Sequence, residues 1–208
     1  ALLAQSEERF RSLFNNMAEG VALHEVHFDA SGKPSNYRIV NCNPQYERIL
    51  GVQRAEVVER LATEVYRTTD PPYLAEFCRV ALSGIPSRME TYFKPMGRYF
   101  DISVAPWGRD GFATIFSDVT DRKAAEAALK SSEQKYRSII ESIEEGYFEL
   151  DLRGNLTFFN TALCHITGLA AEEIAGINYR KYTTPETAEK MVQVFRRIYR
   201  TTRPSGIH

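Results

Sequence analysis

The apolar and polar positions of residues 1–120 follow two different periods. Phe10, Leu13 and Met17 recur at helical spacing, so we expect the chain to open with an amphipathic helix. Within residues 97–106, every second side chain from Phe100 to Val104 is apolar, which predicts a strand with one face on a core. The pattern therefore predicts both helical and extended segments in this part of the chain.

Turn and cap residues divide this region into elements. Residues 29–36 (DASGKPSN) are rich in Asp, Ser, Gly and Pro, which predicts a hairpin loop between two strands. Asn43 is placed to cap a helix that begins at Pro44 and ends at Gly51. Short helices are expected within 54–61 and 71–84, and strands at 20–28, 37–41, 88–94, 97–106 and 111–119. We therefore predict an α+β fold: a five-stranded antiparallel sheet with helices on one face, preceded by the amphipathic helix.

The sequence contains this pattern twice. SEERFRSLFNNMAEG (residues 6–20) aligns with SEQKYRSIIESIEEG (residues 132–146). Two later pairs keep the same order, namely residues 43–51 with 160–168 and residues 76–86 with 194–204. Three aligned blocks predict two copies of one domain. Because the sequence ends shortly after the counterpart of Pro86, we expect the second copy to be incomplete, without the last three strands.

We accordingly expect four segments. They are an N-terminal connector helix at 1–19, a first domain at 20–120, a helical linker with coiled-coil character at 121–144, and the N-terminal part of a truncated second domain at 145–208. Each copy thus carries a helix that joins it to whatever lies upstream.

Composition and charge limit the classes of function. Lys and Arg number 26 and Asp and Glu number 27, and this near-neutral balance argues against nucleic-acid binding. No apolar run approaches the roughly 18 residues of a membrane span. Cys42, Cys78 and Cys164 are far apart and odd in number, which indicates a reduced protein. We expect a cytoplasmic chain, or the cytoplasmic part of a membrane-anchored parent.

Motifs typical of catalysis are missing from the sequence. It contains no G-x-S-x-G, no P-loop, no H-E-x-x-H and no G-x-G-x-x-G. It also lacks a phosphoacceptor motif like that of histidine kinases and a G-G-[DE]-[DE]-F motif. None of the four histidines, His24, His27, His165 and His208, belongs to a recognisable site motif. His24 and His27 fall on opposite faces of one predicted strand. We expect no enzyme activity and no metal site within this chain.

The order of elements and several short motifs resemble the PAS domain, a sensor module of bacterial signalling proteins. GKPSNYRIVNCNPQYERILG (residues 32–51) resembles its hairpin-to-helix segment, and residues 146–176 are similar to the same segment of a second PAS domain. FSDVTDRKAAEAALKSSEQKYRSI (residues 116–139) resembles the linker between tandem PAS domains. The resemblance covers nearly the whole chain. It implies the input portion of a two-component sensor of the histidine-kinase type, or of a cyclic-dinucleotide enzyme, whose output domain is not in this chain.

The stretch DVTDR matches the exit signature of the PAS family. Asp118 ends the last predicted strand, and Thr120 or Asp121 can cap the helix that follows. A charge-assisted pair between Asp118 and Arg122 would couple the sheet to the helix. The resemblance implies that these four residues relay a signal into the helix, and a plain helix cap is the alternative.

The predicted linker helix carries a heptad stripe with charged neighbours. Its members are spaced alternately by four and three residues: Ala125, Leu129, Ser132, Tyr136, Ile139 and Ile143. This spacing favours the seam of a parallel homodimer. A single helix whose far end packs on the second domain is the alternative.

The PAS resemblance places a pocket between the sheet and the helices. The sequence lacks the G-x-N-C-R-F-L-Q motif of flavin-binding branches and has no His on the helix before the third strand, so flavin and haem are disfavoured and the cofactor stays open. His165 or Cys78 remains as an axial-ligand alternative. The side chains expected to line the pocket are Tyr46, Phe77, Met89, Thr91, Phe100, Ile102, Thr114 and Phe116, with Tyr92, Arg98 and His24 as polar groups.

Core packing is the alternative interpretation of each of these residues. We predict a sensory, signal-transducing input module that binds a small molecule or a partner and relays through its exit helix to a kinase-type output domain. The alternative is a ligand-free scaffold that serves dimerisation and relay.

Overall fold

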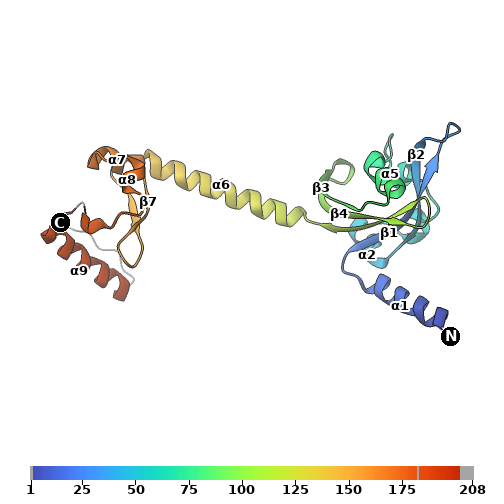
Figure 1. Cartoon of the computed structure of the whole chain (residues 1–208), viewed down its shortest axis with the longest axis horizontal. Coiled ribbons are helices and arrows are strands. Elements are labelled where there is room, and N and C mark those ends of the chain that lie inside the picture. Colours follow the sequence, from blue (N-terminus) through green and yellow to red (C-terminus); the bar gives the residue numbers. More distant parts are fainter. Residues whose placement is uncertain (1, 182, 202–208) are drawn as a thin grey trace. The chain divides into compact units, whose positions relative to one another are not determined.

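The computed structural model describes residues 2–181 and 183–201, which form two compact units. Unit 1 comprises residues 1–127 and unit 2 comprises residues 128–208. The helix α6 (Thr120–Ser142) begins in unit 1 and ends in unit 2 (Figure 1). Each unit is described separately below.

Unit 1 is built around one five-stranded antiparallel sheet. The spatial order of the strands is β2-β1-β5-β4-β3, so the first hairpin and the last three strands meet where β1 pairs with β5. The strands are β1 (Gly20–Phe28), β2 (Pro34–Cys42), β3 (Ser87–Phe93), β4 (Arg98–Trp107) and β5 (Gly111–Asp118). The short turn η1 (Lys94–Met96) joins β3 to β4. The predicted α+β fold is confirmed.

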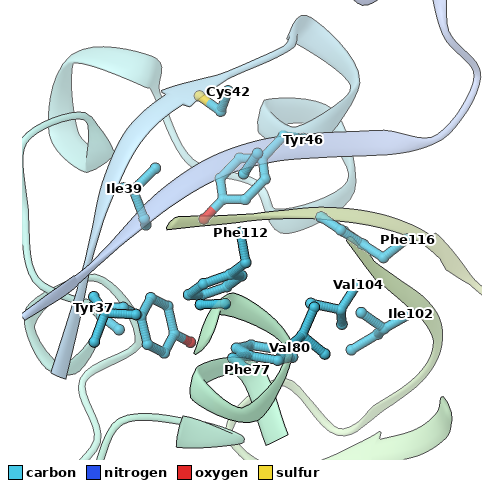
Figure 2. Close-up of a cluster of buried hydrophobic side chains, with 14 of the residues drawn as sticks. Tyr37, Ile39, Cys42, Tyr46, Phe77, Val80, Ile102, Val104, Phe112 and Phe116 are labelled. Atoms are coloured by element: carbon cyan, nitrogen blue, oxygen red, sulfur yellow. The ribbon is translucent and has the colours of Figure 1, made fainter. Parts of the chain in front are cut away.

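Four short helices cover one face of this sheet and close the core. They are α2 (Pro44–Leu50), α3 (Arg54–Val57), α4 (Ala62–Tyr66) and α5 (Leu74–Ser83). In β4, Phe100, Ile102 and Val104 are buried between less buried neighbours, as the period of two predicts. Tyr37, Phe77 and Phe112 converge from β2, α5 and β5 (Figure 2). Their ring centroids are 5.0–5.6 Å apart. The core is therefore rich in aromatic rings.

The first hairpin is tighter than the sequence suggests. Strand β2 begins at Pro34, whereas we expected it to begin at Tyr37. The Asp29 carboxylate accepts hydrogen bonds from the backbone N–H groups of Ser31 and Lys33, which closes the turn within residues 29–33. This local hydrogen bonding by an Asx residue explains the longer strand.

The opening helix α1 (Leu2–Asn16) forms as predicted, but most of its apolar stripe does not face the core. Phe10 is 51% exposed and Leu13 is 71% exposed, whereas Phe14 is buried. Met17 lies beyond the end of the helix. The helical spacing thus predicted the helix correctly and did not predict which of its side chains is buried.

Unit 2 repeats the first half of unit 1. Its two-stranded antiparallel sheet consists of β6 (Phe148–Leu150) and β7 (Leu156–Phe159). Its helices are α7 (Thr161–Thr167), α8 (Ala171–Ile174) and α9 (Pro185–Thr201), with the turn η2 (Tyr179–Lys181). A small core forms around Leu156, Leu163 and Ile174. Within the described residues of unit 2, these two strands are the whole of the sheet.

A buried asparagine makes the same hydrogen bonds in unit 1 and unit 2. In unit 1, the Asn43 Oδ1 atom accepts from the backbone N–H of Val21 (2.9 Å) and of Tyr46 (2.8 Å). Its Nδ2 atom donates to the backbone oxygens of Phe14 (3.1 Å) and Glu19 (2.9 Å). This side chain therefore joins the end of α1, the start of β1 and the first turn of α2.

Asn160 occupies the equivalent position in unit 2. Its Oδ1 atom accepts from the N–H groups of Tyr147 and Leu163, and its Nδ2 atom donates to the backbone oxygens of Ile140 and Glu145. Each of these partners is the repeat counterpart of a partner of Asn43. The alignment predicted only helix capping for this asparagine, and the structure shows that it also holds the preceding helix.

Candidate ligand-binding site

A small cavity lies between the sheet and the helices of unit 1. Its volume is about 50 Å³. Strands β1, β2, β3, β4 and β5, helices α2, α4 and α5, and the segment before α5 all contribute to its wall. The lining residues are His24, Tyr37, Leu50, Tyr66, Pro72, Tyr73, Phe77, Phe93, Phe100, Ile102, Thr114 and Phe116.

His24 is the histidine of this cavity, and it projects from β1 to the inner face of the sheet. Its ring stacks on Phe112 with centroids 4.6 Å apart and meets the edge of Tyr37 at 5.3 Å. The Nε2 atom lies 2.9 Å from Thr114 Oγ1, and the Nδ1 atom is buried without a hydrogen-bond partner. Burial lowers the pKa of His24 to about 3, so the imidazole is neutral at pH 7.

Three tyrosines at the cavity direct their hydroxyl groups to protein partners. The Tyr37 hydroxyl donates to the backbone oxygen of Pro72 at 3.1 Å. The Tyr66 hydroxyl lies 2.9 Å from that of Tyr46, and the Tyr73 hydroxyl lies 3.1 Å from Thr91 Oγ1. These contacts hold the rings in place and leave the cavity wall largely apolar.

Six of the residues proposed from the sequence lie at the cavity. They are Phe77, Phe100, Ile102, Thr114, Phe116 and the polar candidate His24. Tyr46 is fully buried behind Tyr66, Met89 packs against the core, and Thr91 bonds Tyr73. These three side chains support the wall and are not lining residues.

The other two polar candidates are placed elsewhere. Tyr92 is 50% exposed and packs against Tyr99 on the outer face of the sheet, because β3 turns Phe93 inward instead. Arg98 is exposed at the start of β4, where it donates to the backbone oxygen of Ile49 at 2.9 Å. Neither side chain lines the cavity.

The predicted Asp118–Arg122 ion pair is wrong, since Asp118 has other partners. Its Oδ2 atom lies 3.4 Å from Arg98 Nη1, and its Oδ1 atom accepts from the backbone N–H of Thr120 at 2.9 Å. The Thr120 hydroxyl accepts from the N–H of Tyr99, also at 2.9 Å. Asp118 therefore supplies the cap that we assigned to Thr120 or Asp121, and Asp121 is exposed in the first turn of α6.

Arg122 is held by a strand instead. It pairs with Glu90 of β3 and, at 2.9 Å, with Glu126 one turn along α6. Lys123 reaches the same Glu90 carboxylate at 2.5 Å. The two cations lower the pKa of Glu90, so this carboxylate is ionised at neutral pH. The start of α6 is thus tied both to β3 and to the end of β5.

Several residues that line the cavity were not predicted from the sequence. Strand alternation could have identified some of them, whereas no periodic pattern marks the others. Tyr37 and Phe93 lie on strands, and the alternation of β2 and β3 could have assigned them to the inner face. Tyr66 is the last residue of α4 and Tyr73 precedes α5, and the positive φ angles at Arg67 and Tyr73 follow no simple period. Leu50 is the last residue of α2, and Pro72 lies in the segment before α5.

Three further findings bear on the site, and each concerns the described part of the chain. His, Cys, Asp and Glu side chains form no group of three or more that could hold a metal ion there. None of the helices described is long and apolar enough to cross a membrane. The two remaining ligand candidates lie apart from the cavity, because Cys78 is buried in α5 outside its lining and His165 is exposed on α7.

The repeat, the five-stranded sheet and the helix-covered cavity define a tandem α+β module. Residues 8–83 match a family model described as PAS domain, and residues 134–208 match one described as PAS fold. The chain belongs to the PAS family and carries two PAS domains in tandem.

One curated relative is Sporulation kinase E of Bacillus subtilis (strain 168). It is 25% identical to this chain over 176 residues, which cover 83% of the chain. The chain spans 22% of the length of that relative. The likeness therefore concerns about a fifth of that kinase.

Two solved structures are similar to this chain. A domain of a sensory box sensor histidine kinase/response regulator from Geobacter sulfurreducens has 18% identity and a TM-score of 0.42, over 56% of this chain and 96% of that one. The PAS domain of Bordetella pertussis BvgS has 19% identity and a TM-score of 0.44, over 63% of this chain and 98% of that one.

Proposed function

We propose that this chain is a sensory input module in which unit 1 binds a small molecule and passes the binding event to α6. The observation that carries the proposal is the cavity between the sheet and the helices, with a buried, unpartnered nitrogen of His24 in its wall. A buried polar atom without a partner costs about 1–3 kcal/mol. A ligand that satisfies this atom would recover that cost and would also fill the cavity.

A chain of contacts leads from the cavity wall to α6. Leu50 lines the cavity, and the backbone oxygen of the preceding residue accepts from Arg98. Arg98 pairs with Asp118, which caps the backbone N–H of Thr120 at the start of α6. In the proposed relay, a displacement of Leu50 by a ligand changes this hydrogen-bond path and so biases the direction of α6.

The interaction energies along this path limit the coupling free energy between ligand binding and α6. Arg98 and Asp118 are partly exposed, and such ion pairs contribute about 0–1 kcal/mol each. A coupling free energy of 1 kcal/mol corresponds to roughly a fivefold change in an equilibrium. The relay can therefore bias a two-state output, and ligand binding must favour one state to do so.

We further propose that α6 forms the seam of a parallel homodimer. Leu129, Tyr136 and Ile139 of the predicted stripe are 53–63% exposed, and Ala125 and Ser132 are exposed on the same helix. Ile143 follows the end of α6 and extends the seam only if the helix lengthens in the dimer. Burial of large apolar side chains against a second copy would remove this surface from water.

Replacing Leu129 by aspartate is expected to convert the proposed dimer to a monomer. Two aspartates facing each other at an a-type position would bury like charges in place of two leucines. Sedimentation velocity of the full chain at micromolar concentration would measure this change. Lys130→Asp, which alters charge at the adjacent, non-seam position, should leave the dimer intact, and a dimer that survives Leu129→Asp would contradict the seam.

A ligand-free scaffold is the second candidate function. The small cavity volume of about 50 Å³ and the many aromatic rings around it favour this alternative. In that case unit 1 would serve dimerisation and relay while its core stays filled by its own side chains.

Native mass spectrometry of the full chain distinguishes the two candidates. Under the sensor proposal, the gently purified chain is expected to carry a discrete extra mass that is lost on denaturation. A dimer at twice the bare chain mass, with no small-molecule adduct and no mass gained from a library of metabolites, would favour the scaffold.

We assign the output activity to a part of a longer protein outside this chain, and the kinase named as a relative supports an output of that kind. Catalysis is accordingly not assigned to these residues. The three free cysteines, Cys42, Cys78 and Cys164, support operation in a reducing compartment such as the cytoplasm.

A further inference from the structure

His24, which lines the cavity of unit 1, has a polar atom that the protein itself does not satisfy. Among the described residues, two buried side-chain polar atoms have no partner, His24 Nδ1 and Thr68 Oγ1. Only His24 belongs to the cavity wall. Because the histidine is 1% exposed, water outside the protein does not reach this nitrogen.

The hydrogen bond between His24 Nε2 and Thr114 Oγ1 allows Nδ1 to act either as a donor or as an acceptor. If Nε2 donates to Thr114 Oγ1, Nδ1 is an acceptor; if the threonine hydroxyl donates to Nε2, Nδ1 carries the proton and donates. Exchange between these two arrangements needs only a change of tautomer and a hydroxyl rotation. The site can thus pair with either a donor or an acceptor atom.

The cavity is lined by uncharged side chains. Its residues include no Lys, Arg, Asp or Glu. Burial keeps His24 neutral by lowering its pKa, and burial likewise raises the pKa of Tyr37 and of Tyr66, so both phenols stay protonated. A charged ligand would lose its hydration here without gaining an opposite charge.

The volume of the cavity limits the size of its occupant. A dry cavity of about 150 Å³ holds benzene in a well-studied engineered protein. The cavity here is about 50 Å³, which corresponds to a molecule of only a few heavy atoms unless side chains move.

We propose that unit 1 selects a small uncharged molecule whose polar group pairs with His24 Nδ1 and whose apolar part contacts Phe77, Phe100 and Phe116. Primary amides and short alcohols have this chemistry. This inference rests on the proposed function, since it names the ligand class of the same site.

Unit 2 supplies the matched substitution for a test. The repeat places Leu150 of β6 at the position that His24 occupies in β1. His24→Leu therefore introduces the residue that the second copy uses at this point, with similar volume and without a polar atom. His27→Leu is the control variant, because it makes the same substitution at an exposed position of β1 that does not line the cavity.

The experiment compares three molecules of equal shape and different charge by NMR on the full chain. Acetamide, acetate and acetamidinium each have four heavy atoms. Acetamide is expected to shift the backbone amides around the cavity and the His24 imidazole nitrogens, with millimolar affinity. Acetate and acetamidinium are expected to bind there at least tenfold more weakly, and His24→Leu is expected to weaken acetamide about tenfold, a factor equivalent to 1.4 kcal/mol.

The outcomes separate this inference from the sensor proposal. Equal binding of acetate or acetamidinium in the cavity, or acetamide binding unchanged by His24→Leu, overturns the inference while the sensor proposal stands. Absence of any response at the His24 imidazole of the unaltered chain also overturns the inference, whether or not the leucine variant folds. The sensor proposal fails separately, when the native mass measurement shows no bound molecule and none of the three probes shifts the backbone amides around the cavity.

Discussion

Replacing Asn43 by alanine is expected to lower the free energy of unfolding of unit 1 by about 3–5 kcal/mol. The substitution removes the partners of four backbone groups, which belong to Phe14, Glu19, Val21 and Tyr46. Asn43 is fully buried, so water cannot easily replace the lost hydrogen bonds. Because domains are stable by only about 5–15 kcal/mol, this loss is a large fraction of the total.

Urea unfolding followed by tryptophan fluorescence measures this effect. The chain has one tryptophan, Trp107, which lies in β4 and therefore reports on unit 1. Asn160→Ala is the matched control, because it removes the equivalent bonds of unit 2 and should leave the tryptophan transition in place. A loss below about 1 kcal/mol in Asn43→Ala would show that the backbone groups find other partners.

The sequence predicted the fold of unit 1 well because its signals are local and periodic. Alternation identified the face of β4 that carries Phe100 and Ile102, and Asn43 with Gly51 bounded α2. The errors in the fold have physical causes of their own. The Asx turn at Asp29 lengthened β2, and α1 buries Phe14 instead of the stripe that helical spacing selects.

The site was only partly predictable, since tertiary contacts decide it. Strand alternation correctly placed Phe100, Ile102 and Thr114 on the cavity side of the sheet. The same alternation also selects Arg98, but the Arg98 side chain extends to the end of α2, where it donates to the backbone oxygen of Ile49. The ion pairs at the start of α6 depend on the distance between Glu90 and Arg122, residues on different elements. No pattern within either element reports that distance.

Lowering the pH from 6.5 to 4.5 is expected to destabilise unit 1 by about 2 kcal/mol through His24 alone. Burial lowers the folded-state pKa of His24 to about 3 from the ordinary value of 6.5. Between these two values the unfolded chain binds a proton that the folded chain does not, so the free energy of unfolding rises with pH. The contribution is complete above pH 6.5 and is lost as the pH falls toward 3.

The pH window separates His24 from the carboxylates. Ion pairs and hydrogen bonds lower the pKa of Glu76, Glu90 and Asp101, and these groups also favour the folded state at higher pH. Their unfolded-state pKa values are near 4, so their contributions are lost mainly below about pH 4.5. Stability measurements between pH 6.5 and 4.5 therefore report chiefly on histidine.

His24→Leu is expected to remove this slope, and His27→Gln is its matched control. His27 lies on the same strand with its side chain exposed on the opposite face, so its loss should leave the slope in place. Urea unfolding followed by the fluorescence of Trp107 at several pH values would give both slopes. If the free energy of unfolding of His24→Leu depends on pH as strongly as that of the parent chain, then His24 is protonated or hydrated in the folded state. A hydrated His24 would no longer have the unsatisfied nitrogen on which the proposed ligand selection depends.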